Sequence, residues 1–498
     1  MSTGQPTISV CMPTCNQARY LAEAIESVLR QTRQDFELVI YDDASSDDTP
    51  QIARLFSDER VRYFRQPSTV GIAENRNSCL QVATGTYVAW LDSDDTYHRE
   101  MLATQSDILD IQDDVSFVHG AFEVVDPAGR HLPRWPVAFA EDTVETSAEA
   151  FAELSVCNYV TTPTVMVRRS CHDRAGPFAA EIGRSSTDWH MWLRLACLGD
   201  VAFTATPVAC YRQHPESISA VTAKQGERLR CDERVLERIF STCGERVASA
   251  THLERRAKAA LAARFLLCSG ERFVAGDRTT AAELGRHALE VAPWLNNGPA
   301  AFEFLKSIEM NREYDNFRMS RSLLARLQRE FRDSRYGQQL AKQIIDNAQW
   351  HETLRAIART IDRVLPEDVI VATVDKADPT LLALCRRRGH HFPDWRLVPP
   401  GYPVDSDAAI AHLEQLQAFG VSYIVFPCTA FWWLEHYRGL KAYLSQTGTK
   451  LWDDERVVVY ELSRCDSCLS TKSSSAELSA NTKSLRLSET EASCCDNR

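Results

Sequence analysis

Two acidic clusters follow apolar runs in the first hundred residues. Residues 42–49 read DDASSDDT directly after the run 36–41, and residues 91–95 read LDSDD directly after YVAW. A carboxylate in the first cluster can accept the N3–H of a uracil or the hydroxyls of a ribose. The second cluster holds three acids within four residues, and a divalent cation with oxygen ligands would offset their repulsion and bridge to a diphosphate. The alternatives are a polar loop that caps a helix and a plain acidic turn.

Strand and helix patterns alternate around these clusters. Short apolar runs at 8–12, 36–41, 61–65 and 87–91 predict strands, and the spacing of apolar residues over 20–29 and 72–82 predicts helices. Thr49 and Pro50 are typical of a helix start. Such alternation predicts βαβ units and a parallel sheet. Both clusters then lie at the carboxyl edge of that sheet, where ligands bind in open α/β folds.

The motifs in this region resemble those of one enzyme family. The segments PTCNQARYLAEAIESVLRQT, FELVIYDDASSDDT, VGIAENRN and TGTYVAWLDSDDTY are similar, in order and spacing, to the nucleotide-binding half of family 2 glycosyltransferases. The likeness covers roughly residues 7–115. It implies an α/β domain of the GT-A (Rossmann-like) fold and an inverting transferase. The donor would be a nucleotide-sugar, usually UDP-linked, and the cofactor Mn²⁺ or Mg²⁺.

The resemblance assigns donor-site roles at the matching positions. The residues matched to nucleotide contacts are Pro13, Thr14, Asn16, Asp42, Asp43, Arg76, Asn77 and Asp92. Which of the two acids Asp42 and Asp43 contacts the base stays open. Asp94 is the expected metal ligand. Arg76 has an alternative reading, as a structural ion-pair partner of Asp42.

The catalytic base is expected in the second half of the same domain. The segment SSTDWHMWLR resembles the family's acidic-Asp-Trp helix start, so Asp188 would take the proton of the acceptor hydroxyl. Thr187 stands where the family more often has Glu, and an acid favoured only by the helix dipole is the alternative. Trp189 and Trp192 are read equally as sugar-stacking or core residues. The segment YRQHPESIS resembles the family's closing segment and makes His214 a predicted metal or phosphate ligand.

The remaining chain falls into three parts by composition. We predict a glycosyltransferase domain over 1–222, a helical connector or bundle over 223–365 and a smaller α/β accessory domain over 366–463. The aromatic run FWW at 431–433 could bind sugar but fits a core at helical spacing. Residues 464–498 lack aromatics and are expected to be disordered. Their cysteine pairs are a weak zinc motif.

Composition limits the partners. With 56 Lys and Arg against 68 Asp and Glu, the net charge is −12, which argues against nucleic acid as a partner. No apolar run is long enough for a membrane span and no signal peptide is recognised. A cytoplasmic enzyme is expected, with peripheral membrane association open, acting on a saccharide or lipid-linked acceptor. The alternatives are a non-catalytic nucleotide or carbohydrate-binding protein and a sugar-phosphate nucleotidyltransferase.

Overall fold

The computed structural model describes residues 6–133, 139–224, 227–243, 247, 249–274, 277–296, 321–375, 381, 387–394 and 402–463. The chain divides into two compact units. The first comprises Met1–Ser269, Ala282–Lys306 and Met319–Ile345, and the second comprises Gly270–Ala281, Ser307–Arg318 and Asp346–Arg498. The predicted disordered tail, 464–498, lies outside the described residues. The predicted boundaries at 222, 365 and 463 stay predictions.

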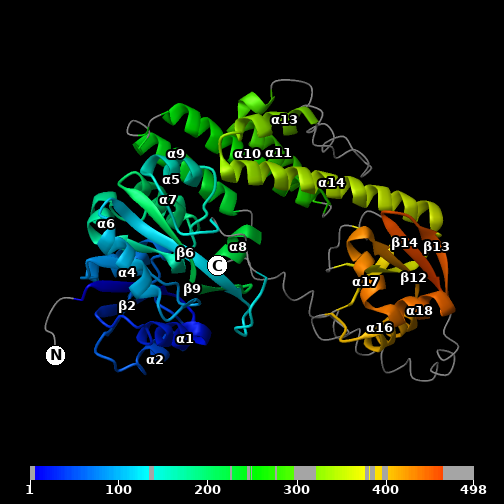
Figure 1. Cartoon of the computed structure of the whole chain (residues 1–498), viewed down its shortest axis with the longest axis horizontal. Coiled ribbons are helices and arrows are strands. Elements are labelled where there is room, and N and C mark those ends of the chain that lie inside the picture. Colours follow the sequence, from blue (N-terminus) through cyan, green and yellow to red (C-terminus); the bar gives the residue numbers. More distant parts are fainter. Residues whose placement is uncertain are drawn as a thin grey trace, which may run out of the picture. The chain divides into compact units, whose positions relative to one another are not determined.

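The first unit begins with alternating strands and helices (Figure 1). They are β1 (Ile8–Thr14), α1 (Ala18–Leu29), β2 (Phe36–Asp42), α2 (Thr49–Ala53), β3 (Val61–Arg65), α3 (Ile72–Val82) and β4 (Tyr87–Trp90). β1 and β4 are buried along their whole length, which explains their mostly apolar sequences; the buried Ser9 of β1 donates its hydroxyl to Glu37. Leu21, Ile25 and Val28 of α1 are buried against this sheet. The predicted α/β fold is confirmed.

The second half of this unit extends the same sheet. Its elements are β5 (Thr96–Tyr97), α4 (Met101–Ile111), β6 (Val115–Val125), β7 (Thr143–Glu145), α5 (Ser147–Leu154), η1 (Thr162–Thr164), β8 (Met166–Arg168), α6 (Arg169–Ala175), η2 (Ala180–Ile182), α7 (Thr187–Ala196) and β9 (Asp200–Arg212). The strand order is β3-β2-β1-β4-β8-β6-β9-β5, with β7 on β9. β1 pairs in parallel with β2 on one side and β4 on the other. The strand order reverses at β1, and in open α/β sheets ligands bind at the carboxyl ends of the strands at such a point.

Helices fill most of the following region. They are α8 (Ile218–Lys224), α9 (Glu227–Cys243), α10 (Ala250–Val274), α11 (Arg278–Val291), η4 (Pro293–Asn296), α13 (Arg321–Glu330) and α14 (Arg335–Val364). α9 lies beside α7 (Figure 1). Its apolar face buries Val235, Leu236 and Ile239. The first part of the predicted connector is therefore packed on the domain that precedes it.

The second unit has its own smaller sheet. Its elements are β10 (Ile370–Val374), β11 (Arg388–Phe392), α16 (Ser406–Ala418), β12 (Val421–Pro427), η6 (Cys428–Ala430), α17 (Phe431–His436), α18 (Arg438–Thr447), β13 (Gly448–Asp453) and β14 (Val457–Leu462), in strand order β11-β10-β12-β14-β13. Trp433 is buried in the core, whereas Trp432 is 39% exposed. Throughout the described ranges, we find no helix whose length and apolar character would let it cross a membrane.

Candidate active site

The first acidic cluster shapes the loops at the end of β2. Asp42 is fully buried; its carboxylate accepts hydrogen bonds from the Ser45 amide at 2.9 Å and the Tyr63 hydroxyl at 2.7 Å. The Asp43 carboxylate accepts the backbone N–H groups of Val70 at 2.7 Å and Gly71 at 2.9 Å. Gly71 has a φ of 91°, which a side chain would disfavour. These bonds fix the loop that leads into α3; a contact of either acid with a base stays a prediction.

Strained backbone borders the same edge. Asn16, Ala44 and Ser186 adopt left-handed φ angles of 54°, 57° and 64°, although none of them is glycine. Asn16 follows β1 and accepts the Ser46 amide at 2.8 Å through its side chain, which ties the loops after β1 and β2 together. Strained backbone of this kind persists only where the surrounding contacts fix it, and it is found most often at functional sites. Pro13 and Thr14 end β1 opposite Tyr41 and Asp42.

The second acidic cluster meets a buried arginine. An Nη of Arg76 is 3.2 Å from an Asp92 carboxylate oxygen, and its other Nη is 3.4 Å from the Thr187 hydroxyl. Arg76 is nearly buried, and its guanidinium lies 5.5 Å from the Phe178 ring centre. It thus bridges the acid after β4 to the first residue of α7. The alternative partner, Asp42, is instead bound by Arg65 at 3.3 Å.

Asp94 pairs with a histidine from the end of β9. His214 Nε2 lies 2.9 Å from Asp94 Oδ2, and the His214 side chain is buried. The hydrogen bond to Asp94 raises the pKa of His214, with Glu216 acting in the same direction. Asp94 is the predicted metal ligand and His214 the predicted metal or phosphate ligand, and the fold brings these two residues from distant motifs together.

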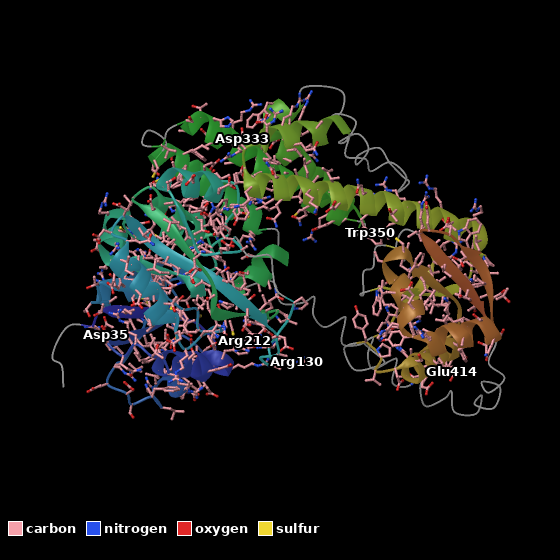
Figure 2. All side chains as sticks on the ribbon, in the orientation of Figure 1. Asp35, Arg130, Arg212, Asp333, Trp350 and Glu414 are labelled. Atoms are coloured by element: carbon pink, nitrogen blue, oxygen red, sulfur yellow. The ribbon has the colours of Figure 1, made fainter. Side chains whose placement is uncertain are left out.

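Arg212 braces this pair. Its backbone N–H donates to Asp95 Oδ1 at 2.7 Å, and its Nε donates to the Asp94 carbonyl at 2.8 Å. Its Nη1 reaches the carbonyl of Asp126, the residue whose carboxylate also binds Arg130 (Figure 2). The residues predicted from the sequence did not include Arg212, although it stands two positions before His214.

Two of the three acids after β4 have raised pKa values. Burial raises the pKa of Asp92, the charges of Asp94 and Asp188 act in the same direction, and the ion pair with Arg76 opposes them. Full burial, with Asp94 and Asp92 close by, raises the pKa of Asp95 well above its usual value. Of these two acids, Asp95 therefore keeps its proton more readily.

Asp188 occupies the first turn of α7. Its Oδ2 lies 3.4 Å from both the Asn158 amide nitrogen and the Thr162 hydroxyl. The preceding Ser186 donates its hydroxyl to Asp232 of α9 at 2.7 Å. The helical region thus holds the strained entry to α7, a contribution that the sequence did not indicate.

Three other residues singled out in the sequence make structural contacts in this structure. The Asn77 side chain donates to the Phe178 carbonyl at 3.0 Å and accepts its N–H at 2.7 Å, so its amide secures that loop. Trp189 and Trp192 are buried, and Trp189 Nε1 donates to the Leu154 carbonyl at 2.7 Å. Of the two readings of these tryptophans, the structure favours the core.

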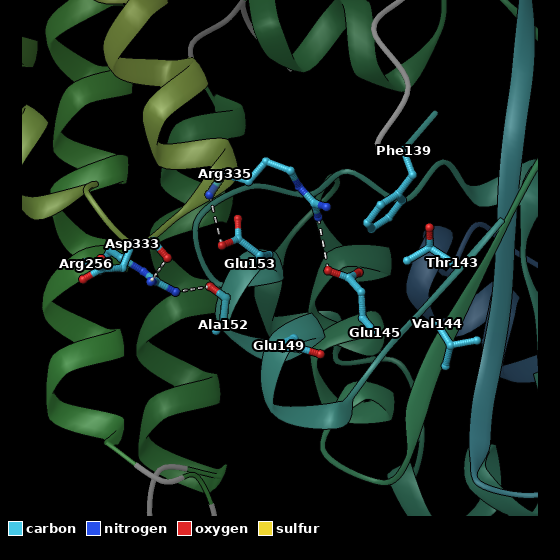
Figure 3. A pocket seen from close by; sticks show the side chains of 10 residues that line it. All are labelled: Phe139, Thr143, Val144, Glu145, Glu149, Ala152, Glu153, Arg256, Asp333 and Arg335. Atoms are coloured by element: carbon cyan, nitrogen blue, oxygen red, sulfur yellow. Dashed lines mark hydrogen bonds and ion pairs between the residues drawn. The ribbon is translucent and has the colours of Figure 1, made fainter. Parts of the chain in front are cut away.

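A separate pocket of about 490 Å³ lies between β7, α5 and the starts of α10 and α14 (Figure 3). None of the predicted site residues lines it. Its arginines are bound to its own walls: Arg335 pairs with Glu145 at 3.1 Å, and Arg256 donates to the carbonyls of Ala152 and Asp333. Because these cations are already neutralised or hydrogen-bonded, the pocket is a poor match for a nucleotide diphosphate.

Comparison with known proteins finds similarities in this region. Residues 9–174 match the model of "Glycosyl transferase family 2". The Escherichia coli UDP-Glc:alpha-D-GlcNAc-diphosphoundecaprenol beta-1,3-glucosyltransferase WfgD is 35% identical over 118 residues, which are 24% of this chain and 46% of WfgD. The putative teichuronic acid biosynthesis glycosyltransferase TuaG of Bacillus subtilis is 27% identical over 242 residues, which are 48% of this chain and 92% of TuaG.

The likeness is partial in both sequence and structure. The chain spans less than half the length of WfgD and 30% of a glycosyltransferase of Rickettsia felis. A crystal structure of Staphylococcus aureus TarS in complex with UDP-GlcNAc overlaps 62% of this chain and 89% of its own. The two share 17% sequence identity with a TM-score of 0.48.

Proposed function

We propose that the protein is an inverting glycosyltransferase of the GT-A fold, and the match of residues 9–174 to the model of glycosyl transferase family 2 supports this proposal. It would move a sugar from a nucleotide donor, UDP-linked, to a hydroxyl of a saccharide or lipid-linked acceptor. The domain order of 1–222, 223–365 and 366–463 is part of this proposal.

The donor would lie along the carboxyl ends of β1, β2 and β4. The loops after β1 and β2 border the nucleotide, and Asp94, His214 and Asp92 would hold Mn²⁺ or Mg²⁺. The fit rests on the donor set: carboxylate oxygens with one imidazole suit Mn²⁺ and Mg²⁺ better than a thiol-rich site would. When bound, the ion offsets the charge that develops on the leaving diphosphate.

Asp188 would act as the general base. Its carboxylate receives the proton of the acceptor hydroxyl while that oxygen bonds to the anomeric carbon and the bond from that carbon to the diphosphate breaks. One displacement from the opposite face inverts the anomeric configuration. Asn158 and Thr162 keep the carboxylate oriented.

The observation that most supports this proposal is the pair of contacts that Arg76 makes. Arg76 joins Asp92 on the donor side to Thr187, the neighbour of Asp188, at the start of α7. A fixed guanidinium between the two sides sets the separation between donor and base, which a displacement reaction requires. A polar loop or an isolated acidic turn would not need such a link.

The acceptor class is supported by the relatives. The name of WfgD describes a diphosphoundecaprenol-linked acceptor. We propose that this protein likewise acts on a lipid-linked saccharide acceptor. Such an acceptor would bring a cytoplasmic protein to the membrane surface as a peripheral enzyme.

The test is turnover of UDP-sugars with Mn²⁺, offered a free oligosaccharide or a polyprenyl-diphosphate-linked saccharide. Asp188→Asn should lower kcat by about 10²–10⁴-fold while UDP affinity stays the same. Asp173→Asn, which changes an exposed acid on α6, is the matched control and should behave as wild type. Normal turnover by Asp188→Asn would refute the base, and UDP binding without transfer to any acceptor would favour a non-catalytic binding protein.

A further inference from the structure

A second group of metal-binding side chains lies outside the donor site. His98, Glu123 and Cys210 each offer one ligand atom, and these three atoms lie within 4.8 Å of one another. His98 follows β5, Glu123 lies on β6 and Cys210 lies on β9. We propose that these side chains, together with His131, form a zinc site. This proposal does not rest on the transferase activity.

The sheet itself sets the positions of these ligands. Cys210 pairs with Thr96 of β5 on one side and with Glu123 of β6 on the other. The His98 amide donates to the Val208 carbonyl at 2.9 Å, which continues the β5 pairing by one step. Backbone hydrogen bonds on three neighbouring segments therefore bring the ligands together before any metal binds. Such preorganisation lowers the ordering cost of binding.

The chain turns back after β6 and brings a fourth ligand. A bridge between Val125 and His131 closes this turn. His131 Nδ1 then lies 3.6 Å from Glu123 Oε2. The His131 side chain is 65% exposed and that of His98 is 37% exposed, so a cation can enter from solvent.

Three of the separations are close to those around a tetrahedral zinc ion. Zinc binds nitrogen and oxygen at about 2.0–2.2 Å and sulfur at about 2.3 Å, which gives ligand-to-ligand edges of about 3.3–3.7 Å in a tetrahedron. His98 Nε2 is 3.3 Å from Glu123 Oε2 and 3.8 Å from Cys210 Sγ, and His131 Nδ1 is 3.6 Å from Glu123 Oε2. His131 lies outside the group whose ligand atoms are all within 4.8 Å of one another, so its exposed side chain would turn toward the ion on binding.

The donor set also selects the metal. A thiolate with two imidazoles favours zinc, whereas Mg²⁺ and Mn²⁺ prefer oxygen ligands. Binding breaks the Cys210 S–H bond and forms a sulfur–zinc bond. The proton passes to solvent, with no oxidation or reduction. The chain would then hold two different metals at separate places.

Zinc here would reinforce the edge that carries the donor-site acids. From Cys210, β9 continues to Arg212, which binds Asp95 and Asp94, and then to His214. Joining β5, β6 and β9 through one ion would hold these segments in register. We expect zinc to raise the melting temperature of the protein.

The test uses the full-length reduced protein, stripped of metal and titrated with Co²⁺ as a spectroscopic substitute for zinc. All proteins carry serine at the four cysteines of 464–498, because these could bind cobalt themselves. The parent should take up one equivalent with a thiolate-to-cobalt charge-transfer band that Zn²⁺ removes and excess Mg²⁺ does not. Cys428→Ser, which changes a partly buried thiol in the other unit, should keep the band.

Cys210→Ser should lose the band. Loss of groups that only orient ligands costs about 10–100-fold in metal affinity, so loss of the thiolate should weaken zinc binding by more than about 100-fold. His98→Gln and His131→Gln should keep a weaker band, and the metal-free variants should melt as the metal-free parent does. The proposal is overturned if the band persists in Cys210→Ser, or if the parent binds no cobalt or zinc at micromolar concentration.

Discussion

Two neighbouring acids allow a sharp test of the donor-site metal. Asp94 and Asp95 stand side by side after β4, and each can be changed to asparagine. Asp94 is partly exposed and pairs with His214 at 2.9 Å. Asp95 is buried, and its raised pKa means that it tends to carry a proton. We expect Asp94→Asn to impair Mn²⁺ binding severely and Asp95→Asn to leave it nearly unchanged.

The size of the difference follows from the charges. A doubly charged ion and one carboxylate charge about 4 Å apart interact by about 8 kcal/mol at an effective dielectric constant near 20, and we take about half of this as the net loss because the site is partly exposed and screened by solvent. The Asp94→Asn side chain would keep one oxygen but lose the negative charge, so Mn²⁺ affinity should fall by about two to three decades, at about 1.4 kcal/mol per decade. Asparagine is close in shape to a protonated aspartate, and in Asp95→Asn its carbonyl oxygen can still accept the Arg212 N–H. For Asp95→Asn we expect a change below about threefold.

Isothermal calorimetry of Mn²⁺ binding in the presence of UDP measures both variants. Urea unfolding of the metal-free proteins checks that neither variant has lost its fold. Equal losses in the two variants would refute the assignment of separate roles. Mn²⁺ affinity of Asp94→Asn within about threefold of wild type would remove Asp94 from the metal site.

Two further predictions concern stability. Burial, with a contribution from Arg335, lowers the pKa of His119 to about 3, so the folded protein keeps this imidazole neutral. The stability gained by burying this neutral imidazole is fully present above about pH 6.5 and is lost as the pH falls toward 3. The free energy of unfolding should drop by about 1.4 kcal/mol per pH unit in that window. In His119→Phe, the free energy of unfolding from urea titrations at each pH should lose this slope. Asp43→Asn should cost about 1.5–3 kcal/mol, because the carboxylate binds two backbone amides; an unchanged urea midpoint would contradict this.

Much of the donor edge could be predicted from local sequence. The strand runs before Asp42 and Asp92 are mostly apolar, with Glu37 as the charged exception, and parallel strands align their carboxyl ends at one edge. Two acidic clusters placed after such runs must therefore lie near each other. The meeting of Asp94 with His214 needed the family motif as well, since the intervening strands run in both directions.

The supports of the site could not be predicted in this way. Arg212 donates its backbone N–H to Asp95 and its Nε to the Asp94 carbonyl, and the sequence does not show which backbone groups face one another across the sheet. The Ser186–Asp232 bond joins a strained residue to a helix that composition marked only as a connector. Asn77 shows the same limit from the other side: its motif predicts a donor contact, which stays a prediction, while its amide forms two hydrogen bonds with the backbone of Phe178 that the motif does not indicate.

Charge balance explains why this edge suits a divalent cation. Asp92, Asp94 and Asp188 carry three negative charges when ionised, and Arg76 supplies one positive charge. The cluster is left with two negative charges if His214 is neutral. In the absence of metal, a proton on His214, favoured by its hydrogen bond to Asp94, would offset one of these charges. A divalent ion can replace that proton and neutralise the cluster, and Asp95, whose pKa is raised by burial, would add least to the charge that the ion meets.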